Sequence, residues 1–191
     1  MKTVKFLFLT AFCAIFFSSC SYNKMVSKQE AVASQWGQVE NVYQRRADLI
    51  PNLVNTVKGY TAHEAQTLQS VTEARSKATQ ITVDPNNLTP EKLKEFQDAQ
   101  GTVGSALGRL IAISENYPEL KADLNFRDLQ VQLEGTENRI TVERNKFNTA
   151  VQDYNTYIRQ FPRLIYAGWF GFEKKAYFEA KEGADEAPKV E

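Results

Sequence analysis

Residues 126–161 read FRDLQVQLEGTENRITVERNKFNTAVQDYNTYIRQF, and large side chains recur in this stretch at spacings of three and four only. That spacing returns each side chain to one face of an α-helix. The pattern predicts one long helix that stops at Pro162, because proline cannot continue a helix. The stripe consists of Phe126, Leu129, Leu133, Thr136, Ile140, Arg144, Phe147, Val151, Tyr154, Ile158 and Phe161.

The same spacing runs upstream from Val32 to Val71, and we expect that helical stretch to end around residues 78–81. Pro51 lies inside it. Proline lacks a backbone donor and clashes with the carbonyl four residues earlier, so we expect this first long helix to be kinked or broken near Pro51. Asp48, just before the proline, is a candidate cap for the second half.

A third helix is predicted after the turn residues 84–87, with Thr89 as its cap and Pro90 at its first position. It ends near Pro118. Its middle carries Gly101, Gly104 and Gly108, and each glycine costs roughly 1 kcal/mol relative to alanine. Two explanations stay open: close approach of a neighbouring helix, or local fraying.

No segment alternates polar and apolar residues for long, so no substantial sheet is expected. Long amphipathic helices joined by short loops predict an all-α fold, an antiparallel bundle of three to four long helices. We expect residues 29–180 to form this domain, residues 20–28 to be a tether, and the acidic residues 181–191 to be disordered.

The first nineteen residues have the pattern of an export signal. Lys2 and Lys5 precede an apolar run over residues 6–17, which is too short for a comfortable membrane span. The ending Ser18-Ser19-Cys20 resembles a bacterial lipobox, which implies cleavage before Cys20 and lipid attachment to it. The alternatives are a soluble secreted protein and an uncleaved anchor. All three place the folded part outside the cytoplasm, on the periplasmic side if the cell has two membranes.

The amino-acid composition argues against several classes of function, namely nucleic-acid binding, metal binding and catalysis. The chain has 23 basic and 23 acidic residues, so it lacks the cationic footprint expected of a nucleic-acid-binding protein. Its cysteines, Cys13 and Cys20, both lie in the first twenty residues, and His63 is its single histidine. His63-Glu64 begins like a zinc-protease motif, but Thr67 stands where the second histidine belongs. We therefore expect no metal, no cofactor and no enzymatic activity.

A series of ordered motifs resembles the LemA family over residues 26–180. The resemblance implies a mostly helical bundle outside the cytoplasm, tethered at its N-terminus, and no reaction or catalytic residue. The motifs are Arg45–Val54, Val57–Tyr60 with His63 and Glu64, Val71–Arg75, Tyr117–Ala122, Leu133–Ile140, Phe147-Asn148, Tyr154-Asn155, Ile158–Pro162, Phe170–Phe172 and Tyr177-Phe178.

Charged residues of the first and last long helices are the candidates for fixing helix register or contacting a partner. A buried ion pair contributes little net stability but can set the alignment of two helices. Solvated helix faces are the alternative. The candidates are Arg45, Arg46, Asp48, Glu137, Arg139 and Arg144. Asparagines inside the motifs, such as Asn148 and Asn155, are expected to bond across the bundle, because asparagine is an indifferent helix former.

The segment from Phe161 to Phe178 is rich in aromatic residues. One interpretation is that it folds back over the open end of the bundle. The other is a patch for the membrane interface or a partner, made of Trp169, Phe170, Phe172, Tyr177 and Phe178, with Lys174 and Lys175 beside it.

These patterns favour a structural or interaction protein of the bacterial cell envelope, tethered to the membrane and contacting another envelope protein. A lipid- or peptide-binding module is the second hypothesis, using the aromatic segment or a groove between helices. A carboxylate-based hydrolase is the enzyme version compatible with the residues, but the sequence contains no motif for it.

Overall fold

The computed structural model describes the backbone of residues 2–61 and 64–179, and side chains from residue 21 onward within those ranges. All regular structure in the described residues is helical, which confirms the predicted all-α class. In chain order the helices are α1 (Lys2–Lys58), α2 (Ala65–Gln80), the 3₁₀ turn η1 (Pro85–Asn87), α3 (Pro90–Ser114), α4 (Pro118–Ala122), α5 (Leu124–Arg159) and α6 (Arg163–Ala167).

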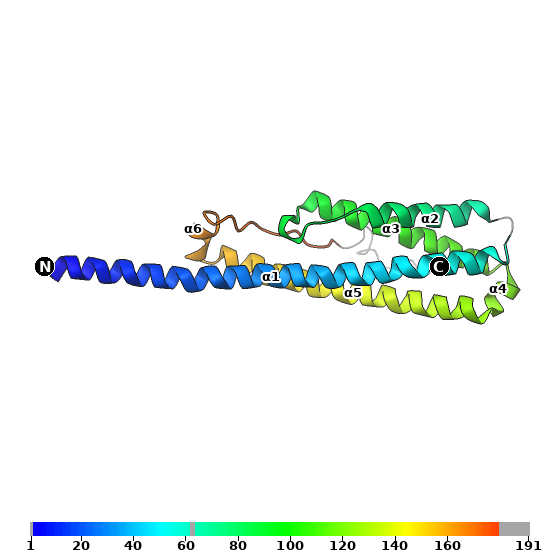
Figure 1. Cartoon of the computed structure of the whole chain (residues 1–191), viewed down its shortest axis with the longest axis horizontal. Coiled ribbons are helices and arrows are strands. Elements are labelled where there is room, and N and C mark those ends of the chain that lie inside the picture. Colours follow the sequence, from blue (N-terminus) through cyan, green and yellow to red (C-terminus); the bar gives the residue numbers. More distant parts are fainter. Residues whose placement is uncertain (1, 62–63, 180–191) are drawn as a thin grey trace, which may run out of the picture.

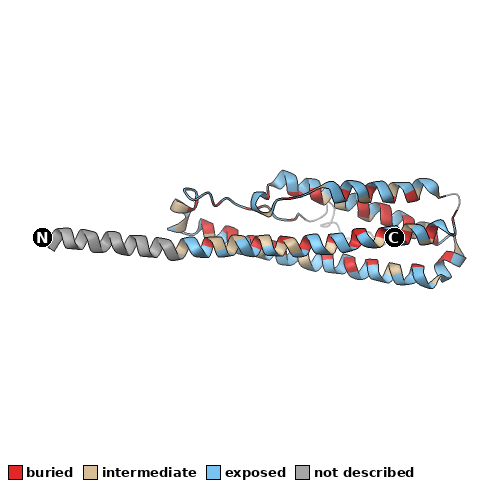
Figure 2. Cartoon of the chain, in the orientation of Figure 1, coloured by how far each residue is buried: buried red, intermediate tan, exposed pale blue. Residues whose placement is uncertain are grey.

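The four long helices lie along one another, and the chain reverses direction between successive long helices (Figure 1). The largest contact joins α1 to α5, followed by the pair α2 and α3, and α1 also contacts α2. Buried residues lie on the faces that these helices turn toward one another (Figure 2). After α6 the chain runs back along the helices as an extended segment (Figure 1).

Helix starts follow the predicted local chemistry. The Thr89 hydroxyl accepts a hydrogen bond from the Lys92 amide at 3.3 Å, as expected of an N-cap. The carboxylate of Asp123 does the same for the Phe126 amide at 2.9 Å and starts α5. The stripe predicted over residues 126–161 is therefore contained almost entirely in α5, which ends at Arg159.

Of the kink or break predicted near Pro51, the break is wrong, because α1 continues through Pro51 to Lys58. Pro51 leaves the Ala47 carbonyl without its usual donor within the helix. That carbonyl instead accepts a hydrogen bond from Nε of Arg75 on α2, at 2.7 Å. The proline ring is exposed to solvent, so it displaces no core side chain.

The first helical stretch ends at residue 58. Gly59 and Tyr60 donate backbone hydrogen bonds to Thr56 and Val57 and close the last turn of α1. Glycine is a poor helix former, and the apolar stripe has a gap of eight positions between Tyr60 and Leu68. That gap was the sequence signal for a break at this point.

The folded part also begins earlier than the predicted boundary at Gln29. Residues 21–28, expected to be a tether, belong to α1, and the side chain of Met25 is completely buried. Met25 packs in the same cluster as Val32 and Trp36, because it continues their helical face toward the N-terminus. The Cys20 side chain and the predicted tail 181–191 lie outside what the structure describes.

The core has two clusters along the helix axes. The proximal cluster, near α6, includes Trp36, Leu93, Phe147, Tyr154 and Phe178. The distal cluster, near α4, includes Ile50, Leu53, Val71, Leu110 and Phe126. On α1 the two clusters meet between Tyr43 and Ile50.

Candidate interaction site

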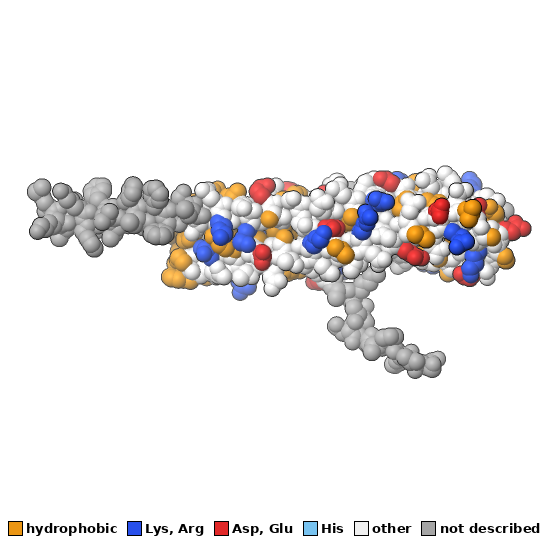
Figure 3. Space-filling view, turned by 90° about the horizontal axis from the view of Figure 1, so that it is seen from below, with side chains coloured by type: hydrophobic (Ala, Val, Ile, Leu, Met, Phe, Trp, Pro, Cys, Tyr) orange, Lys and Arg blue, Asp and Glu red, His pale blue; other side chains and the backbone are white. Residues whose placement is uncertain are grey.

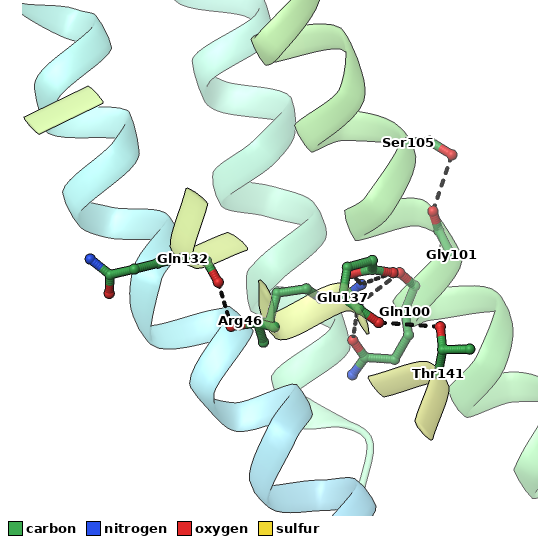
Figure 4. Close-up of polar contacts among 8 residues, drawn as sticks. Arg46, Gln100, Gly101, Ser105, Gln132, Glu137 and Thr141 are labelled. Atoms are coloured by element: carbon green, nitrogen blue, oxygen red, sulfur yellow. Dashed lines mark hydrogen bonds and ion pairs between the residues drawn. The ribbon is translucent and has the colours of Figure 1, made fainter. Parts of the chain in front are cut away.

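Arg46 lies at the junction of the two core clusters and is almost fully buried, with 3% of its surface exposed. Its Nη1 atom lies 3.0 Å from Oε2 of Glu137 on α5. Its Nη2 atom donates to Gln100 on α3, at 2.6 Å to the side-chain oxygen and 3.0 Å to the backbone oxygen. Figure 4 shows this guanidinium joining three helices. We call Arg46, Gln100 and Glu137 the polar node.

The polar node supplies the ion-pair and hydrogen-bond partners for the buried guanidinium of Arg46. A buried guanidinium needs an anion and several acceptors to offset its lost hydration, and the node supplies both. The Arg46 guanidinium also lies 5.0 Å from the centre of the Tyr43 ring. Burial raises the pKa of the Tyr43 phenol, and the nearby charges of Arg144 and Arg46 oppose that rise. The node holds the geometry expected of a register-setting pair, and its effect on register stays a prediction.

The other charged candidates do not join the node's hydrogen bonds. Arg45 and Arg139 are exposed. Asp48 is exposed in mid-helix and accepts a hydrogen bond from Gln44 at 2.7 Å, so the expectation that it caps a helix is wrong. Arg144 donates to the backbone oxygen of Glu179 at 2.9 Å and lies over the Phe178 ring. Its main contact is thus the C-terminal segment.

An open groove of about 850 Å³ adjoins the polar node. Tyr43 and Arg46 of α1 contribute to its lining, α3 forms one wall, and Glu137 and Arg144 of α5 belong to the other. Glu179 borders it where the described chain ends. The remaining lining residues are Lys94, Gln97, Asp98, Gln100, Gly101, Thr102, Gly104, Ser105 and Arg109.

The wall from α3 is low, because Gly101 and Gly104 have no side chains there. A Cβ atom built at Gly101 would meet no atom within 4 Å, and one at Gly104 would only reach Arg46 Nη1 at 4.0 Å. No neighbouring helix of the described chain therefore requires Gly101. The helix is also not frayed, since α3 is continuous from Pro90 to Ser114. Neither explanation offered by the sequence accounts for this glycine within the described residues.

Two asparagines of α5 hold the C-terminal segment in place. The Asn155 amide accepts from the Lys175 backbone N–H and donates to its carbonyl, both at 2.9 Å. Asn148 makes the same pair of bonds with Phe178, at 2.8 and 3.0 Å. The side chain of Lys175 bonds to the Asn86 carbonyl, and burial lowers its pKa. The two asparagine side chains thus form hydrogen bonds with an extended segment, whereas hydrogen bonds across the bundle were predicted.

The five residues of the predicted aromatic patch do not form one surface in the structure. Phe172 and Phe178 are buried, and Phe178 stacks on Trp36 with ring centres 5.9 Å apart. They belong to the proximal core because the asparagine bonds draw the segment between the helices. Trp169, Phe170 and Tyr177 are exposed, at 81%, 54% and 42%. The patch therefore divides into core residues and surface residues.

The described residues contain neither a cluster suited to a metal ion nor a membrane-spanning helix. In that part of the chain, no three His, Cys, Asp or Glu side chains gather as a metal site would require. His63 lies outside the described residues. Nor does any described helix have the length and apolar character needed to cross a bilayer. The predicted apolar run over residues 6–17 falls where side chains are not described.

The chain is similar to several characterised sequences. It is 27% identical to the magnetosome protein MamQ 2 of Paramagnetospirillum magneticum over 86% of its length, and 28% identical to MamQ of Magnetospirillum gryphiswaldense over the same share. It is 26% identical to Protein LemA of Metamycoplasma hominis over 77% of its length. These matches span 66%, 66% and 60% of the respective relatives, slightly less than two thirds of each.

The LemA family profile matches residues 35–191, which include the polar node, both asparagine bonds and the α3 glycines. The motifs quoted from the sequence fall in the same region, from Arg45 to Phe178. On this match, which covers most of its length, the chain belongs to the LemA family.

Proposed function

We propose that this protein is a membrane-tethered, extracytoplasmic module of the bacterial cell envelope, an antiparallel LemA-type bundle that docks another envelope protein in the groove between α3 and α5. The observation that carries the proposal is the groove itself, an open space of about 850 Å³ lined by α1, α3 and α5. On its α3 wall, Gly101 faces open space.

The shape and charges of the groove support docking by a polypeptide. Gly101 and Gly104 leave room at the α3 wall for a partner backbone to approach the helix. The groove is lined by charges of both signs, including the basic Arg109 and Arg144 and the acidic Asp98 and Glu137. A polar segment with alternating charges fits this lining better than an apolar ligand does.

The N-terminal sequence supports the tether. Two lysines, an apolar run and Ser-Ser-Cys occur in the order of a lipoprotein export signal, and Cys20 is the expected lipid attachment site.

Site-specific photo-crosslinking in intact cells tests the groove. A photoreactive residue at Ser105, which is exposed in the groove wall, should capture a defined envelope protein. Gly101→Leu should abolish that crosslink by filling the groove, while it stabilises α3 by roughly 0.8 kcal/mol. The matched control is Gly135→Leu, since Gly135 is an exposed glycine of α5 that also faces open space.

A crosslink lost in Gly101→Leu and kept in Gly135→Leu supports groove docking. A crosslink that survives Gly101→Leu would contradict it. The tether is tested separately by Cys20→Ala, which should move the protein from the membrane fraction to the soluble fraction. An unchanged membrane fraction in that variant would contradict lipid attachment at Cys20.

A further inference from the structure

We infer that α6 and its flanking residues form a second membrane contact, an apolar and basic surface that rests on the anionic lipid headgroups beside the N-terminal tether. This inference relies on the proposed tethering and adds the lipid surface as a binding partner. The surface, here called the α6 patch, consists of Phe161, Leu164, Ile165, Trp169 and Phe170.

The α6 patch is unusually exposed for its composition. Phe161 and Trp169 have 82% and 81% of their surface accessible, and the other three members have more than half. Beneath them, Ala167 and Phe172 are buried and fix the short helix to the body. Large apolar side chains that gather on one surface mark an interaction site more often than isolated ones do. In Figure 3, hydrophobic side chains gather at the end of the described body where α1 emerges.

The patch lies beside the start of the described side chains, which places it next to the tether. The Tyr22 ring contacts Phe170, with ring centres 5.1 Å apart, and Phe172 at 5.6 Å. Tyr22 is two residues from Cys20, so their Cα atoms are at most about 7 Å apart in any conformation. A lipid on Cys20 would therefore hold the patch against the bilayer surface.

The charges around the patch match an anionic bilayer. Residues 154–172 contain no aspartate or glutamate, whereas Asp153 and Glu173 flank them and Asp153 pairs with Lys28 at 3.7 Å. Arg163 lies 4.0 Å from the centre of the Tyr157 ring, and Lys24 and Lys28 approach the same ring within 6 Å, at 5.9 and 5.8 Å. This cluster gathers cations from α1 and α6 at one end of the molecule. Basic residues near an anionic membrane surface are attracted to it electrostatically.

The residue types favour lipid over a protein partner or a second copy of the chain. Tryptophan and tyrosine rings suit the headgroup region, where one edge is apolar and the other is wet. The proposed tether would also place a bilayer at this end of the molecule. With two contacts at one end, the helices would project from the membrane, and α5 alone is about 54 Å long.

Trp169 provides the test, because the chain has two tryptophans and the other, Trp36, is buried. In a Trp36→Phe background, the full chain is reconstituted into vesicles of phosphatidylethanolamine and phosphatidylglycerol that carry doxyl-labelled lipid. We expect about a twofold quenching of Trp169 emission, as for an interfacial side chain. The matched probe is Leu124→Trp with Trp169→Phe, since Leu124 is 73% exposed at the opposite end of α5 and should not be quenched.

A second pair of variants tests the patch itself. Ile165→Glu should reduce the quenching of Trp169, while Val131→Glu, at an exposed apolar position of α5, should leave it unchanged. If the vesicles carry the protein on flotation but Trp169 is quenched no more than the probe at 124, the α6 patch is wrong and the tether stands. If the protein does not float with the vesicles, both the tether and the patch are wrong.

Discussion

A single side chain explains why α1 tolerates a proline in its middle. Pro51 cannot bond to the Ala47 carbonyl, and Arg75 of α2 supplies the missing donor at 2.7 Å. Such a carbonyl would otherwise remain without a partner in a partly buried position, which costs free energy. The sequence identified Pro51 as a helix-breaking residue. It did not reveal the compensating donor, because Arg75 lies on another helix and has no fixed spacing from Pro51.

This compensation predicts a coupling between the two residues. Arg75→Met should lower the free energy of unfolding by about 1–2 kcal/mol, because the Ala47 carbonyl loses its charged donor. In a Pro51→Ala background the same change should cost much less, since the new amide at residue 51 bonds within the helix. Urea unfolding of the four proteins measures the coupling, and equal effects of Arg75→Met in both backgrounds would contradict it.

Tyr154 is a second residue whose environment has a measurable consequence. Its side chain is fully buried, and the hydroxyl finds no hydrogen-bond partner among the described residues. Burial disfavours the phenolate and raises the pKa of Tyr154 from 10.0 to about 12. Between these pH values an unfolded chain loses the phenol proton while the folded chain keeps it. Stability should therefore fall as pH rises from 10 toward 12.

Tyr154→Phe should remove that part of the alkaline loss. A shift of this size corresponds to roughly 2–3 kcal/mol. Near neutral pH we expect the variant to be as stable as the parent or slightly more so, because it buries no unpaired hydroxyl. Urea unfolding at about pH 8 and about pH 11 compares the two proteins. An equal alkaline loss in both would contradict the assignment.

Among the helices, α5 was the most predictable and the segment that follows it the least. An unbroken stripe of threes and fours, with a proline just after it, fixed the extent of α5 to within a few residues. The break at Gly59 was missed because Pro51 is the stronger local signal. The extended segment after α6 has no periodicity, and its bonds to Asn148 and Asn155 join residues 30 and 20 positions apart.

The asparagine pair predicts how this segment is released. Asn148→Ala with Asn155→Ala should remove four hydrogen bonds, each worth about 1 kcal/mol, and leave the helices intact. The amides of Lys175 and Phe178 should lose protection in hydrogen exchange. Asn138→Ala on the exposed face of α5 is the control. Unchanged exchange in the double variant would show that side-chain packing alone holds the segment.

At the scale of the whole molecule, the polar node divides one helical stack into two cores. Arg46 and Glu137 were both among the charged residues predicted to fix helix register or contact a partner, and the structure joins them in one ion pair. Its third member, Gln100, has no distinguishing signal in the sequence, and Arg144 was expected there but bonds elsewhere. The groove was not predictable either, because it depends on which helices leave a gap between them.

Because a polar layer separates the two cores, a substitution in one core should destabilise that core more than the other. Leu53→Ala opens a cavity in the distal cluster, and Leu93→Ala opens one in the proximal cluster. Because both leucine side chains are nearly fully buried, each substitution should lower the free energy of unfolding by about 2–5 kcal/mol. We expect Leu53→Ala to speed hydrogen exchange around Val71 and Leu110. Leu93→Ala should instead shift the unfolding transition that Trp36 fluorescence reports, in a Trp169→Phe background. Identical responses to both variants would show that the cores unfold as one unit.

The stacking of Phe178 on Trp36 also constrains when the proximal core can form during synthesis. Phe178 lies far downstream of Trp36, so Trp36 leaves the ribosome long before its ring partner does. The proximal core therefore cannot close until Phe178 has emerged. Up to that point the nascent polypeptide must stay incompletely folded, which is the condition that passage through a protein-conducting channel requires.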